Sequence, residues 1–169
     1  MKKLDLELSI RSMQEAINYI EQYKRYMILK TARFVEELAN AGIPVIDANM
    51  NTEGDSDPEH YAFVKVHSYG DYSEAILTVQ GRDLLFIEFG AGVHYNGAAG
   101  SSDHPKGTEW GYTIGSYGHG HGAEDFWWYQ DDSGDSKKSY GTKASMPVLQ
   151  ADKEIMSKVR EVARKVFGG

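Results

Sequence analysis

The stretch that decides the fold is SIRSMQEAINYIEQYKRYMILKTARFVEELANAGIP, residues 9–44. Its apolar residues recur at spacings of three, four and seven, which places one stripe of them along a helix: Ile10, Met13, Ile17, Ile20, Met27, Phe34 and Leu38. Ser12 and Glu15 have the spacing of a capping box, while Gly42 and Pro44 suggest a left-handed C-cap and a stop. We therefore predict a helix from about residue 10 to 40, roughly 45 Å long at about 1.5 Å per residue.

A helix of that length needs a large surface to pack against. Lys24 and Thr31 fall on the apolar stripe and break its heptad, so packing against a sheet or against neighbouring subunits is favoured over a simple two-stranded coil. Tyr19, Tyr23 and Tyr26 form a second, amphipathic face. These tyrosines fit either the edge of a core or an interface.

The middle of the chain has the composition of strands. Residues 61–69 and 74–80 are joined by the turn GDYS and predict a hairpin, after a polar connector at residues 47–60. The segment DLLFIEFGAG, residues 83–92, is apolar at nearly every position, which fits a buried strand or a short buried helix. Near the N-terminus, LDLELSI alternates like a half-buried strand, or it is the frayed entry to the helix that follows.

The chain closes with a second predicted helix. Pro147 suits a first helical turn with Ser145 near the cap, and the expected buried stripe contains Val148, Ile155, Val159, Val162 and Val166. We therefore predict an α+β fold in which the N-terminal and C-terminal helices pack on a small, mainly antiparallel sheet. Residues 1–169 are expected to form a single domain with a long irregular insert, rich in glycine and aromatic residues, at about 90–141.

Composition limits the function classes. The net charge of −7 argues against direct binding of nucleic acid, because phosphates would be repelled. Cysteine is absent, which excludes disulfides and thiolate metal sites. No apolar run approaches a membrane span and the start lacks the core of a signal peptide, so we expect no membrane partner and a cytoplasmic location.

The insert contains the residues that most invite a functional reading. Twelve of the 18 glycines lie between Gly90 and Gly141. Within it, GSYGHGHGAEDFWWYQDD (115–132) carries His119 and His121, which could bind a metal with a third ligand from Glu124, Asp125, His104 or His94. Flanking glycines make that site weak, because fixing each ligand costs backbone entropy. Tryptophans in the same region could instead stack on sugars.

Glu88 is the unusual polar residue of the apolar segment. Burial would raise its pKa and make it a candidate acid or base, but no partner stands at a defined spacing in sequence. We expect a structural role, either capping backbone amides or pairing with Arg82. The chain has no nucleophile elbow and no phosphate-binding loop, so we predict no catalytic residue, no cofactor and no metal site.

Two stretches together resemble a known family. FIEFGAG, residues 86–92, is similar to the Glu-Phe-Gly-Thr/Ala-Gly signature of the tail-completion, or minor capsid, proteins of long-tailed bacteriophages. GTKASMPVLQA, residues 141–151, resembles that family's second signature, a Gly-Thr-x-Ala segment followed by Met-Pro and an alanine that opens the last helix. The chain departs from the pattern at Val148, where the family often has Met, and its GHGHG loop has no counterpart.

The resemblance implies a structural protein at the head-to-tail junction that acts without catalysis. Subunits would associate in a homo-oligomeric ring and bind tail and connector proteins, assembling in the host cytoplasm and residing in the tail or neck of the virion. The residues expected to anchor contacts, within the subunit core or at an interface, are Phe126, Trp127, Trp128 and Tyr129. The alternatives are a metal-dependent hydrolase using His119, His121 and Asp125, and a carbohydrate-binding module built on Trp110, Trp127 and Trp128.

Overall fold

The computed structural model describes residues 9–50, 59–90, 104–107, 109–110, 126–131, 133–139 and 144–168. In chain order its elements are α1 (Ile10–Asn40), α2 (Ile43–Met50), β1 (His60–Ser68), β2 (Ser73–Gly81), α3 (Leu84–Phe89), β3 (Trp127–Gln130), β4 (Ser136–Ser139) and α4 (Pro147–Phe167). Two long helices accompany two antiparallel two-stranded sheets, β1–β2 and β3–β4. The predicted α+β fold is confirmed.

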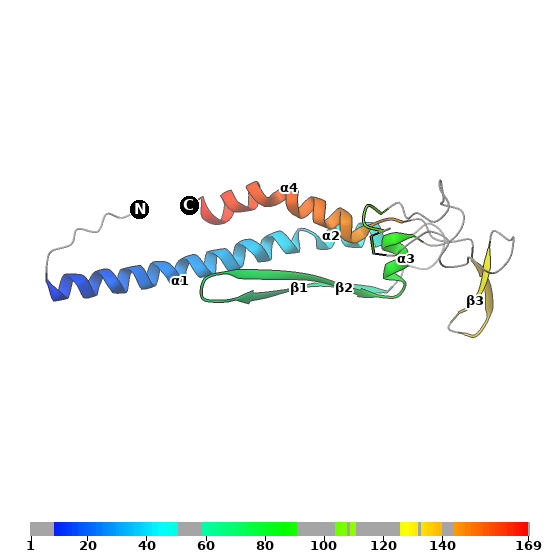
Figure 1. Ribbon diagram of the computed structural model, residues 1–169, viewed down its shortest axis with the longest axis horizontal. Coiled ribbons are helices and arrows are strands. Elements are labelled where there is room, and N and C mark those ends of the chain that lie inside the picture. Colours follow the sequence, from blue (N-terminus) through cyan, green and yellow to red (C-terminus); the bar gives the residue numbers. More distant parts are fainter. Residues whose placement is uncertain are drawn as a thin grey trace.

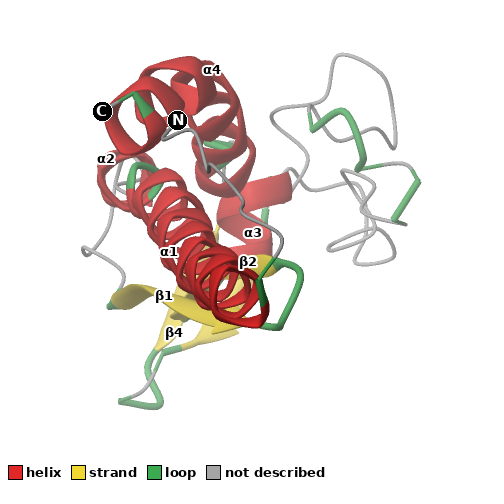
Figure 2. Cartoon of the chain, turned by 90° about the vertical axis from the view of Figure 1, so that its left-hand side faces the viewer, coloured by secondary structure: helices red, strands yellow, loops and turns green. Residues whose placement is uncertain are grey.

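Helix α1 forms the long axis of the molecule (Figure 1). Helix α4 runs along one side of it and the β1–β2 hairpin along another, so that both pack on its C-terminal half (Figure 2). The N-terminal half of α1 extends past the ends of α4 and of the hairpin. Helix α3 lies at the opposite end, beside the start of α4, and β3–β4 lies beyond it.

The start of α1 differs from the predicted capping box. Ser9 is the N-cap, in an extended conformation (φ −131°, ψ 148°), and its side-chain oxygen accepts from the backbone N–H of Ser12 at 3.2 Å. Glu15, one turn further on, forms an exposed ion pair with Arg11 at 3.1 Å. The predicted capping box of Ser12 and Glu15 is therefore wrong. The N-cap hydroxyl belongs to Ser9, about one turn earlier.

The end of α1 also differs from prediction. Ala41 stays in the right-handed region and α2 begins at Ile43, with Pro44 in a first turn where a missing N–H costs nothing. A glycine is needed at position 42 because neighbouring side chains pack closely against its backbone, and not because the helix ends in a left-handed cap. A Cβ there would stand 2.8 Å from Leu77 Cδ2 and 3.0 Å from Ile155 Cδ1. The first four residues of the predicted polar connector, 47–50, therefore belong to α2.

The predicted hairpin is confirmed. Strands β1 and β2 pair in antiparallel register from His60 opposite Gly81 to Ser68 opposite Ser73. Ala62, Leu77 and Val79 pack against the main cluster of core residues, Ile46, Met50, Ile87 and Ala151. The core therefore lies where α2, α3 and α4 meet the hairpin, at one end of the molecule.

Residues 83–92 were expected to form either a buried strand or a short buried helix. Residues 84–89 form the helix α3, in which Ile87, Glu88 and Phe89 are buried. Helix α4 begins at Pro147 as expected, but its N-cap Met146 is left-handed (φ 56°) and gives no side-chain cap. The predicted buried stripe is wrong at Val148, which is 49% exposed, because Pro147 and Ala151 take the inward positions. Val162 and Val166 are buried as predicted.

Candidate functional site

The buried carboxylate of Glu88 caps the start of α4. Its Oε2 accepts from the N–H of Val148 at 2.8 Å, and its Oε1 accepts from the N–H of Leu149 at 3.0 Å. Both amides belong to the first turn of the helix, where N–H groups lack intrahelical partners and the dipole favours negative charge. The predicted role of Glu88 as a cap on backbone amides is confirmed, and it takes the place of the missing N-cap side chain.

A histidine completes the environment of Glu88. His104 is buried, and its Nε2 lies 3.1 Å from Glu88 Oε1. Its Nδ1 accepts from the N–H of Lys106 at 3.1 Å, so the ring hydrogen resides on Nε2 and is donated to the carboxylate. The edge of the imidazole meets Phe89, with ring centroids 4.5 Å apart. Sequence reasoning named His104 only as a metal ligand and missed this pairing.

The geometry of this pair suits anchoring better than proton transfer. Glu88 receives three hydrogen bonds from within the protein, and both groups are buried. A general base has to reach a substrate proton within about 3 Å. Among the residues that the structure describes, no group of three His, Cys, Asp or Glu side chains could hold a metal ion.

The same joint brings both family-like stretches together. The N–H of Ser145 donates to the carbonyl of Ile87 at 2.9 Å, and its hydroxyl donates to the carbonyl of Asn49 at 2.7 Å. Residues 86–90 of the first stretch are thus bonded to residues 144–149 of the second, and the end of α2 is tied to both. We call this set of contacts, centred on Glu88, His104 and Ser145, the Glu88 joint.

Most residues of the alternative metal site, His94, His119, His121, Glu124 and Asp125, lie outside the residues that the structure describes.

The predicted aromatic segment is partly described and is not irregular. Trp127–Gln130 pairs with Ser136–Ser139 as the hairpin β3–β4, and the Asp131 carboxylate accepts from the N–H groups of Ser133 and Asp135 at the turn, both at 2.9 Å. The insert was predicted without strands because serines and lysines dominate β4 and hide any alternation. Lys137 donates to the same carboxylate, which holds the pKa of Asp131 below its usual value.

Most of the described aromatic side chains of the insert lie at the surface. Trp110 is 54% exposed, Trp128 is 64% exposed, and Tyr129 is exposed as well. Phe126 is half-buried, with Trp128 edge-on to it and the Lys138 ammonium 3.3 Å above its ring. Of the two places expected for these anchors, the subunit core or an interface, the core is excluded for Trp128 and Tyr129, because both side chains are exposed.

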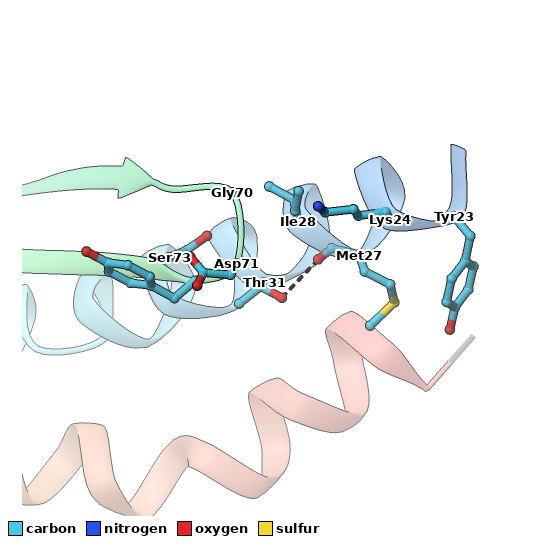
Figure 3. A pocket seen from close by; sticks show the side chains of 9 residues that line it. Tyr23, Lys24, Met27, Ile28, Thr31, Gly70, Asp71 and Ser73 are labelled. Atoms are coloured by element: carbon cyan, nitrogen blue, oxygen red, sulfur yellow. Dashed lines mark hydrogen bonds between the residues drawn. The ribbon is translucent and has the colours of Figure 1, made fainter. Parts of the chain in front are cut away.

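A shallow groove at mid-molecule was not foreseen from the sequence. It has a volume of about 300 Å³ and lies between α1 and the turn of the β1–β2 hairpin (Figure 3). Its lining residues are Tyr23, Lys24, Met27, Ile28, Thr31, Gly70, Asp71, Tyr72 and Ser73. The two polar interruptions of the α1 stripe, Lys24 and Thr31, are part of this lining, which is the sequence signal that could have indicated it.

Comparison of the chain with protein-family models, with curated proteins and with solved structures gives no match. In the described part of the chain, no helix combines the length and the apolar character that crossing a membrane requires.

Proposed function

We propose that the protein is a structural component of a long-tailed bacteriophage that completes the tail or joins it to the head-tail connector, acting by assembly and without catalysis. The observation that carries the proposal is the Glu88 joint. The two stretches that resemble the family's signatures are distant in sequence, yet they form one bonded unit through Glu88 and the amides of Val148 and Leu149, which follow it by 60 and 61 residues.

The distribution of aromatic side chains supports an assembly role. Tyrosine and tryptophan are frequent anchors of protein interfaces, where their large faces leave water. Trp128 and Tyr129 project from a two-stranded hairpin at one end of an elongated molecule (Figure 1). Such a position suits contact with a tail or connector protein, and it leaves the sides of the molecule for neighbours in a ring.

The test is co-assembly with connector and tail-tube proteins. The full chain is co-expressed with those of the phage that encodes it, and the products are separated on a density gradient and imaged by electron microscopy. We expect the chain to migrate with tails or connectors as a ring. A chain that stays in the light fractions with every partner would reject the proposal.

A matched pair of variants shows whether the β3–β4 hairpin supplies the contact. Trp128→Ser is expected to weaken co-migration while leaving the melting temperature unchanged. Tyr61→Ser removes a similarly exposed aromatic from β1 and is the control. Equal co-migration of both variants would assign the contact to another surface.

A further inference from the structure

The N-terminal half of α1 carries an apolar face that the rest of the subunit leaves exposed. Ile10 is 90% exposed, Met13 58%, Ile17 49% and Ile20 59%. Their spacings of three, four and three place them on one side of the helix. We call residues 10–23 the α1 overhang, since α4 ends short of it (Figure 1) and the hairpin turn reaches only its last residue, Tyr23.

The overhang continues a face that is covered further along. The next stripe positions, Lys24, Met27 and Thr31, line the groove beneath the hairpin turn (Figure 3). The stripe of α1 is therefore packed in the second half of the helix, whereas Ile10, Met13, Ile17 and Ile20 are exposed in the first half, where Ala16 beside them is buried. Burial of apolar surface is worth about 25 cal/mol per Å², so four large side chains left in water favour association.

We propose that the α1 overhang pairs in antiparallel orientation with the overhang of a second copy of this chain. In this arrangement Ile10 lies opposite Ile20 of the second copy, and Met13 lies opposite its Ile17. The seam contains only apolar side chains between Ile10 and Ile20. Lys24, the first charged residue of the stripe, marks its end.

The shape of the subunit selects the antiparallel orientation. Packed helices lie about 8 to 10 Å apart. In a parallel pair, the β1–β2 turns of both copies would compete for the space over the same face, because each turn covers that face from Lys24 onward. An antiparallel pair places the two subunit bodies at opposite ends, and each overhang spans about 21 Å at 1.5 Å per residue.

Charge complementarity supports a second copy as the occupant. The antiparallel pair brings the N-terminal end of one α1 to the groove of the other, where the Asp71 carboxylate is part of the lining. The first turn of α1 has no acidic residue of its own to balance the positive end of its dipole. Asp71 of the second copy supplies that charge.

This inference goes beyond the proposed function. A two-fold pair closes at two subunits, whereas a ring needs a separate head-to-tail contact. The overhang contact can therefore hold or fail whether or not the chain joins tails to heads.

The first experiment measures the mass of the full chain by sedimentation across a concentration range. We expect a reversible dimer, and we expect Ile17→Glu to raise its dissociation constant by at least about 100-fold, because pairing would bury two uncompensated carboxylates. The matched control is Gln22→Glu, which adds the same charge on the opposite side of the helix. Far-ultraviolet circular dichroism confirms that the variants keep their helix content.

The outcomes separate this inference from the proposed function. A monomeric wild-type chain, or an oligomer whose mass Ile17→Glu leaves unchanged, overturns the pairing. A monomeric wild-type chain would mean that the exposed face is covered by the chain's own residues 1–8 or by a tail protein. An oligomer whose mass Ile17→Glu leaves unchanged would mean that its subunits associate through a different surface. Neither result changes the co-migration test.

The second experiment determines orientation, which the absence of native cysteine makes simple. A mixture of Met13→Cys and Ile17→Cys chains is expected to form disulfide-linked dimers under mild oxidation faster than Ile10→Cys chains alone. Faster cross-linking of Ile10→Cys would indicate a parallel pair and overturn the proposed arrangement.

Discussion

At the scale of single residues, Glu88 decides how the C-terminal helix begins. Met146 provides no capping side chain, and Pro147 has no N–H to satisfy. The carboxylate reaches the next two amides from another helix, 60 residues earlier in the chain. A buried carboxylate is tolerable there because two amides and an imidazole N–H replace its water.

Replacing Glu88 by Gln tests this account. The amide keeps one acceptor oxygen and turns its NH₂ group toward donors, so at least one buried N–H loses its partner. We expect Glu88→Gln to lower the free energy of unfolding by about 2 to 3 kcal/mol, read by chemical denaturation. Glu21→Gln, at an exposed position of α1, is the control and should change it by less than about 0.5 kcal/mol. Equal effects would show that the cap is not stabilising.

Gly42 makes a second residue-level prediction. A methyl group there must displace Leu77 and Ile155 side chains at the corner between α1 and α2. We expect Gly42→Ala to destabilise the fold by about 1 to 3 kcal/mol through overpacking, measured by thermal unfolding. Gly70→Ala, where an added Cβ meets nothing within 4 Å, is the matched control. An unchanged melting temperature for Gly42→Ala would mean that the corner can relax.

At the scale of elements, an ion pair fastens the end of α4 to α1. Lys165 Nζ lies 2.8 Å from Glu37 Oε2, and Arg33 Nε lies 2.8 Å from Glu37 Oε1. The pKa of Glu37 is held below its usual value, mainly by the hydrogen bond from Lys165 and next by the hydrogen bond from Arg33. The ionised carboxylate therefore stabilises the folded state.

The sign of that shift predicts a pH dependence. The contribution of Glu37 is present above the pKa of an unfolded glutamate, about 4.3, and is lost as pH falls through the lower folded value. We expect Lys165→Met to be less stable than wild type at pH 7 and the difference to shrink below about pH 4. Denaturation at several pH values measures this, with Lys153→Met as an exposed control on α4. A difference that is constant with pH contradicts the assignment.

Elements with a long repeating pattern were predictable, and short ones were not. The stripe from Ile10 to Leu38 gave the bounds of α1, and the strand-like runs around GDYS gave the β1–β2 hairpin. Helix α2 was hidden because Gly42 and Pro44 are ordinary stop signals, and only the packing of Gly42 against Leu77 and Ile155 shows their actual use. The six residues of α3 are too few for a period to separate helix from strand.

At the scale of the whole molecule, the partner of Glu88 was out of reach of sequence reasoning. A capping role could be argued because a lone acidic residue in an apolar segment needs donors. Its donors, however, come from His104 and from the first turn of α4, and no spacing rule connects those positions. The stripe of the overhang was predicted to pack on a sheet or on neighbouring subunits, and its exposure within the subunit could not be foreseen, since periodicity tells which face is apolar but not what covers it.

The uneven distribution of packing predicts uneven local stability. The core residues Ile46, Met50, Ile87 and Ala151 gather at one end of the molecule, whereas the stripe of the overhang is exposed at the other. A helix without tertiary packing is marginally stable, and local opening energies range from about zero to the global value. In the Ile17→Glu variant, we therefore expect amides 14–22 to exchange at least about 100-fold faster than amides 46–50. Hydrogen exchange with peptide-level mass spectrometry measures this.

In the wild-type chain, the exchange of the same overhang amides should slow as the protein concentration rises. A concentration-independent rate would contradict pairing through α1, and slow exchange in the variant would show that the subunit stabilises the overhang by itself.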